Sequence, residues 1–112
     1  MTKKEFKTFK KYVRKWLAIL GLTDWEVSVQ FGKVSEDTAC QTLSENQNRL
    51  ALIRIDEETE NASNKNLELI AIHECLELVM ADIRDALCSF YNADLVDKNI
   101  HRVIRRLENV LK

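Results

Sequence analysis

The chain has 112 residues, of which 46% are hydrophobic and 31% charged, so we expect a single domain, 1–112, with its own apolar core. No run approaches the ~18 apolar residues of a membrane span, and the charged N-terminus lacks the apolar centre of a signal peptide. Three cysteines without a close-spaced pair favour a reduced, cytoplasmic setting.

The net charge of -1 hides a strong segregation along the chain. Residues 1–20 contain seven basic residues and one acid, and residues 98–112 contain five basic residues and one acid. Residues 21–97 contain five basic and sixteen acidic residues. Two interpretations follow: basic end helices lie against an acidic middle, or a basic face contacts nucleic acid or a protein partner.

The first predicted element is a helix from about Lys3 to Leu20, ended by Gly21. Lysines fill the positions between its apolar residues. The apolar residues recur at helical spacing and are Phe6, Phe9, Val13, Trp16, Leu17 and Leu20.

Three strands are predicted next. Residues 25–31 alternate apolar and polar side chains, as a half-buried strand does. A weaker strand covers residues 38–43, and residues 50–55 are apolar enough to be covered on both faces. Because the links are short, an antiparallel meander is favoured.

The C-terminal half is predicted to be helical. An acidic loop at 56–66 leads to a long helix at about 67–89, and a connector at 91–95 leads to a last helix at about 96–111. The order of one helix, three strands and two helices indicates an α+β fold.

The middle of the long helix carries a pattern with chemical meaning, His73-Glu74-Cys75-Leu76-Glu77. At ~100° per residue, positions 73 and 77 lie on one helix face one turn apart, so both side chains can reach one ion. Glu74 stands to one side, where it can act as general base on a water without binding the metal. This is the logic of His-Glu-x-x-His in zinc peptidases, with Glu77 in place of the second histidine.

A third ligand is needed, and His101 is the only other histidine. If the last two helices pack antiparallel, position 101 comes near the middle of the long helix. His73, Glu77 and His101 would then form a set of two histidines and one carboxylate for one zinc ion.

The sequence also allows alternative interpretations of these residues. Glu74 and Glu77 can be part of a solvated polar stripe without a metal. Cys75 is predicted to pack in the core, although a Cys-His nucleophile is conceivable, and Cys40 and Cys88 are interpreted as small hydrophobic residues. Trp16 and Trp25 are predicted to anchor the core rather than to stack on nucleic-acid bases.

Three segments together resemble short zincin-like metallopeptidases encoded by phages and prophages: Asp24-Trp25-Glu26-Val27, Ala71-Ile72-His73-Glu74 and the run from His101 to Glu108. The resemblance covers nearly the full length. It implies a minimal zincin-like fold, with His73 as a ligand, Glu74 as general base and His101 as third ligand. Glu77 stands where the family has its second histidine.

Two functions are therefore expected. The first is a zinc-dependent peptidase that binds an extended peptide or protein segment along a sheet edge, in the host cytoplasm if a phage encodes it. The second is a zincin-like binding or regulatory module that has lost turnover and contacts nucleic acid or protein through its basic terminal helices.

Overall fold

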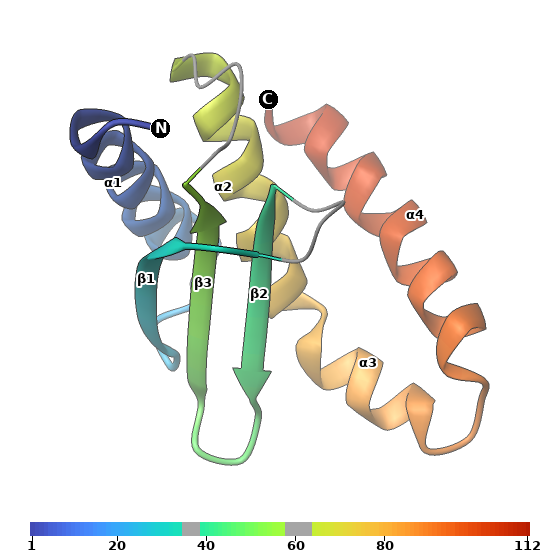
Figure 1. Cartoon of the computed structure of the whole chain (residues 1–112). Helices are drawn as coiled ribbons and strands as arrows, with labels where there is room; N and C mark the ends of the chain where they lie inside the picture. Colours follow the sequence, from blue (N-terminus) through green and yellow to red (C-terminus); the bar gives the residue numbers. More distant parts are fainter. Residues whose placement is uncertain (35–38, 58–63) are drawn as a thin grey trace.

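The computed structural model describes residues 1–34, 39–57 and 64–112. Four helices and three strands follow one another within these residues (Figure 1). They are α1 (Lys3–Ile19), β1 (Glu26–Gly32), β2 (Cys40–Glu45), β3 (Leu50–Asp56), α2 (Asn64–Val79), α3 (Ala81–Cys88) and α4 (Ala93–Leu111). The predicted α+β class is confirmed.

Capping residues at both ends of α1 define where the helix begins and ends. Thr2 and Glu5 form a capping box, in which each side chain accepts a hydrogen bond from the other residue's backbone N–H. At the other end Gly21 has a φ of 70°, and the N–H of Leu22 donates to the carbonyl of Leu17. This is the Schellman ending that glycine favours, and it directs the chain toward β1.

The sheet is mixed, with strand order β1-β3-β2. Strands β2 and β3 form an antiparallel hairpin, whereas β1 pairs with β3 in parallel. The predicted antiparallel meander is therefore wrong for β1. Strand β3, the most apolar of the three, is therefore central and has a neighbour on each side.

The helices cover only one face of this sheet (Figure 1). Ala51, Ile53 and Ile55 on β3 are buried, whereas the alternate residues are half-buried or exposed. The prediction that residues 50–55 are covered on both faces is wrong. This alternation is what an antiparallel pair with one covered face requires.

Several predicted boundaries also change. The long helix predicted at 67–89 is divided at Met80 into α2 and α3, and α4 begins at Ala93, where the side chain of Asn92 caps it. The second strand ends at Glu45 instead of Leu43. Its predicted first residue, 38, and residues 58–63 of the predicted loop lie outside the described residues.

Helix α2 occupies the centre of the molecule, with α1 on one flank and α4 on the other (Figure 1). Trp16, Trp25, Cys40 and Cys75 are buried, as predicted, but Cys88 is exposed. Among the described residues, no helix is long and apolar enough to cross a membrane.

Candidate metal centre

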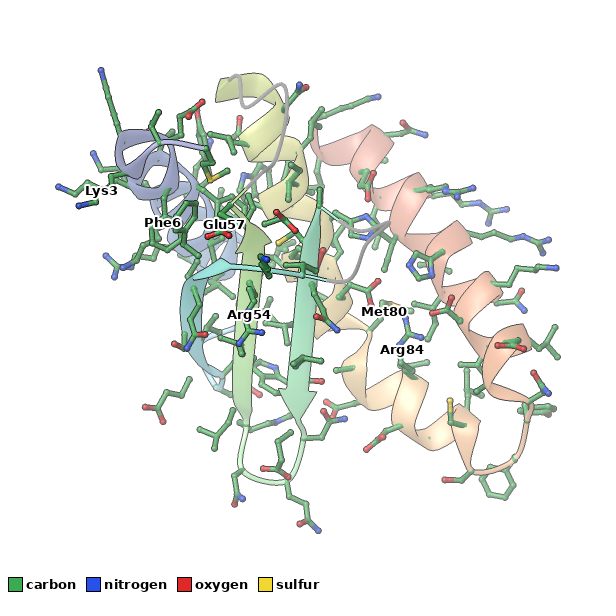
Figure 2. The ribbon with its side chains drawn as sticks, viewed as in Figure 1. Lys3, Phe6, Arg54, Glu57, Met80 and Arg84 are labelled. Atoms are coloured by element: carbon green, nitrogen blue, oxygen red, sulfur yellow. The ribbon has the colours of Figure 1, made fainter. Side chains whose placement is uncertain are left out.

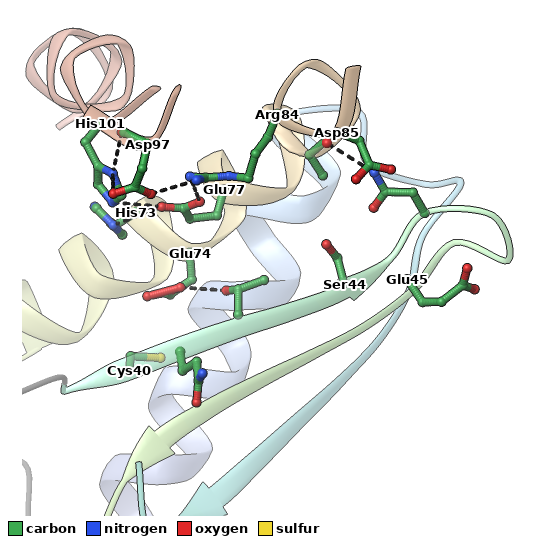
Figure 3. A pocket seen from close by; sticks show the side chains of 14 residues that line it. Cys40, Ser44, Glu45, His73, Glu74, Glu77, Arg84, Asp85, Asp97 and His101 are labelled. Carbon is green, nitrogen blue, oxygen red and sulfur yellow. Dashed lines mark hydrogen bonds and ion pairs between the residues drawn. The ribbon is translucent and has the colours of Figure 1, made fainter. Parts of the chain in front are cut away.

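Helices α2 and α4 bring three ligand-type side chains to one point (Figure 3). The Nε2 atom of His101 lies 3.1 Å from Oε1 of Glu77, and the Nε2 atom of His73 lies 3.7 Å from the same oxygen. One ligand atom from each of the three residues lies within 4.8 Å of the others. The predicted antiparallel approach of the last helix thus places His101 beside the two residues from α2.

The other ring nitrogen of each histidine has its own acceptor. Nδ1 of His73 lies 2.5 Å from Oε1 of Glu108, and Nδ1 of His101 lies 2.9 Å from the backbone oxygen of Asp97. These acceptors favour the tautomer with a proton on Nδ1 and a lone pair on Nε2. Both lone pairs then face Glu77, the arrangement that metal-binding histidines adopt.

Arg84 neutralises the far side of the cluster. Its Nη2 lies 3.0 Å from Oε2 of Glu77, and its Nη1 lies 2.6 Å from Oδ1 of Asp97. The guanidinium therefore holds the carboxylate of Glu77 with Oε2 outward and Oε1 toward the histidines. This contact fixes the direction of a side chain that has several free torsions.

Glu74 is only 6% exposed and is the one buried charged residue in the described part of the chain. Burial raises the pKa of its carboxyl group, and the hydrogen bond from Thr42 together with the electrostatic effect of nearby His73 opposes that rise. Oγ1 of Thr42 donates to Oε2 of Glu74 at 2.6 Å. Thr42 pairs with Ile53 in the β2–β3 register, so its side chain points toward the helices.

These side chains line a hollow of about 720 Å³ between β2 and the helices α2, α3 and α4. Cys40 lies in its wall, where burial raises the pKa of its thiol. Cys75 points away from the hollow, with its Sγ 3.8 Å from the backbone oxygen of Val13, and burial raises the pKa of its thiol to about 12. Neither environment favours the thiolate that a nucleophile needs.

Four residues that support the cluster, Thr42, Arg84, Asp97 and Glu108, were not predicted from the sequence. Asp97 and Glu108 lie on the same face of α4 as His101, and their helical spacing is visible in the sequence. Thr42 and Arg84 carried no local signal, because their roles depend on how β2 and α3 pack against α2.

The donor set suits a divalent metal ion. Two imidazole nitrogens and a carboxylate oxygen are ligands that zinc accepts, and anchored Nδ1 atoms reduce the freedom that binding must remove. The cluster could hold a metal ion. No protein family, curated protein or solved structure matches the chain.

Proposed function

We propose that this protein is a zinc-dependent hydrolase of peptide bonds, with His73, Glu77 and His101 as ligands and Glu74 as general base. The observation that carries the proposal is the convergence of two anchored Nε2 atoms on one oxygen of Glu77. A metal site requires this orientation of its histidine ligands. The resemblance to zincin-like metallopeptidases supports the same assignment.

Glu74 is suited to hold and move a proton. A bound zinc ion supplies Lewis-acid chemistry, in which a carbonyl is polarised and a water becomes more acidic. Glu74 accepts the proton of the attacking water through Oε1, because Thr42 occupies Oε2. Its raised pKa, caused by burial, lets the same carboxyl group pass that proton to the leaving amine.

The proposed substrate is an extended peptide or protein segment. Strand β2 is an edge of the described sheet, and residues 40–42 and 44–46 line the hollow beside the ligands. A peptide added along this edge would present its backbone to Glu74 and the metal-binding cluster. We place this reaction in a reducing cytoplasm, where free thiols such as Cys88 persist.

A second candidate is a metal-binding module that has lost turnover. The ion pair between Arg84 and Glu77 favours it, because a cation next to a ligand carboxylate competes with the metal for negative charge. Such a protein would bind zinc weakly and would not cleave peptides.

The first experiment measures zinc content and zinc affinity of the purified protein. Wild type should bind one zinc ion, and His73→Ala and His101→Ala should each lose stoichiometric binding. The control is Asn109→Ala, an exposed position on α4, which should bind zinc like wild type. Equal zinc binding by wild type and both histidine variants would contradict the proposed metal site.

The second experiment separates the two candidates. Peptide cleavage is compared between zinc-loaded wild type and zinc-loaded Glu74→Gln. Loss of a general base should lower the rate by about 10²- to 10⁴-fold while zinc remains bound. If wild type binds zinc but does not cleave peptides, the result supports the inactive module. If Glu74→Gln cleaves peptides as fast as wild type, Glu74 is not the general base.

A further inference from the structure

Helix α4 has three longitudinal faces. Its apolar face packs into the core through Val96, Ile100 and Ile104. Its second face presents Asp97, His101 and Glu108 to the metal centre. At ~100° per residue, the cations fall within a third sector about 100° wide, next to the metal face and away from the core. We name this sector the basic stripe; it consists of Lys98, Arg102, Arg105 and Arg106.

The basic stripe is exposed and lacks acidic partners. All four side chains are exposed, and Figure 2 shows nitrogen-tipped side chains along the outer side of α4. In the part of the chain that the structure describes, no ion pair or hydrogen bond joins any of them to another side chain. The only acidic residue after position 97, Glu108, is engaged by His73.

Helix stability does not explain this stripe. Exposed helices gain from opposite charges at spacing i, i+4. Asp94 has that position relative to Lys98, but Lys98 with Arg102 and Arg102 with Arg106 place like charges there. Cations also stabilise a helix at its C-terminal end, yet the last turn of α4 contains no basic residue. Four cations are thus concentrated where they repel one another, and a polyanionic partner would relieve that repulsion.

We infer that the basic stripe is a docking surface for the phosphate backbone of a nucleic acid. Three of its four cations are arginines, whose planar guanidinium groups can bind phosphate oxygens in pairs. Positions 98 to 106 rise ~12 Å along the helix axis, a length that spans several phosphates of a duplex. A lipid surface fits less well, because the apolar face of α4 formed by Val96, Ile100 and Ile104 is buried in the core. The exposed apolar residues of α4, which are Leu95, Val103 and Val110, follow one another at about two helical turns and form no continuous apolar face.

The inference goes beyond the proposed hydrolase, because the stripe lies outside the metal centre and its binding needs no turnover. Its location beside the metal face suggests that a bound nucleic acid lies at the rim of the hollow. Loss of zinc by His73→Ala should leave nucleic-acid affinity unchanged, so the two proposals can fail separately.

The test measures the affinity of the full chain for a fluorescent 20-base-pair DNA duplex over a range of salt concentrations. The main variant combines Arg102→Gln, Arg105→Gln and Arg106→Gln. The matched control combines Lys4→Gln, Lys7→Gln and Lys11→Gln, three exposed cations of α1, and removes the same charge. Phosphatidylserine vesicles and polyglutamate serve as the other polyanions.

We expect wild type to bind the duplex with a strong salt dependence. The α4 variant should bind about tenfold or more weakly at low salt and lose about 2.7 from the slope of log K against log salt, since each phosphate contact contributes ~0.9. The α1 variant should change both quantities far less. If the α4 variant does not fold, the pair Lys98→Gln and Arg102→Gln should reduce the slope by about 1.8.

Four results would overturn the inference. They are the absence of duplex binding by wild type at ~50 mM salt, equal losses in the α1 and α4 variants, tighter binding of vesicles than of duplex, and tighter binding of polyglutamate than of duplex. The second result would mean that overall charge, and not the basic stripe, attracts the nucleic acid.

Discussion

Helices α1 and α4 have similar amphipathic patterns but make different contacts with α2. Each is amphipathic, exposes cations and lies on one flank of α2 (Figure 1). Helix α1 contacts α2 mainly through apolar side chains, and at the edge of this contact Lys15 and Trp16 both donate to Glu68. Helix α4 contacts α2 through apolar side chains and through the charged cluster around His73 and Glu77.

The two helices are held in place by different kinds of interaction. Phe9 and Val13 of α1 are fully buried, so the hydrophobic effect holds α1 without any ligand. On the α4 side, carboxylates and imidazoles lie close together in a partly buried site, where their energy depends on charge balance. A metal ion would supply positive charge there, so we expect zinc to stabilise the α4 side more than the α1 side.

The largest loss of stability is expected from Phe9→Ala. Removing this ring from the α1 side of the core should lower the free energy of unfolding by about 3–5 kcal/mol, because it leaves a cavity. Chemical denaturation measures this loss. Val110→Ala on α4, where the side chain is 79% exposed, should stay within ~0.5 kcal/mol of wild type. A loss below ~1 kcal/mol for Phe9→Ala would mean that α1 is not held by its core contacts.

The next largest expected effect is a loss of zinc affinity on the α4 side of α2. Glu108→Gln weakens the acceptor that orients His73 and should reduce zinc affinity about 10- to 100-fold, as measured by competition with a chelating dye. Glu68→Gln is the matched control, because it changes the corresponding carboxylate on the α1 side of α2 and should leave zinc affinity unchanged. Equal effects of both variants would contradict a specific role for Glu108.

A smaller effect is expected at the start of α1. Thr2→Ala removes the capping box with Glu5 and should cost about 1 kcal/mol, as seen in thermal or chemical unfolding. Thr8→Ala in the same helix removes a hydroxyl that only bonds back to the carbonyl of Lys4, and it should be neutral or slightly stabilising. If both variants behave alike, the capping box does not stabilise α1.

The smallest expected effect is a pH dependence of thermal stability in the metal-free protein. Burial raises the pKa of Glu74 in the folded state. The contribution of this carboxyl group to folding stability is therefore fully present below its unfolded-state pKa, where it is protonated. That contribution is lost as the pH rises through the folded-state pKa, because the buried group must then carry a charge. Glu74→Gln avoids that loss and should melt slightly higher than wild type at pH 7, with the difference shrinking toward pH 4. Exposed Glu26→Gln should show no such trend, and a constant difference at all pH values for Glu74→Gln would contradict the assignment.

Much of the local structure could be predicted from the order of residues. The spacing from Phe9 to Trp16 predicted α1 to within one residue at its C-terminal end, because a helical period is a property of neighbouring residues. The same reasoning placed His73 and Glu77 on one helix face. The parallel pairing of β1 and the division at Met80 were not predicted, because both depend on contacts between distant segments.

The sequence by itself therefore determined the amphipathic helices, the alternation in β1 and the shared face of His73 and Glu77. Only the tertiary structure brought His101 to 3.1 Å from Glu77 and supplied acceptors for both Nδ1 atoms. The physical reason is that backbone geometry sets the direction of neighbouring side chains, whereas convergence across helices depends on how their apolar faces pack.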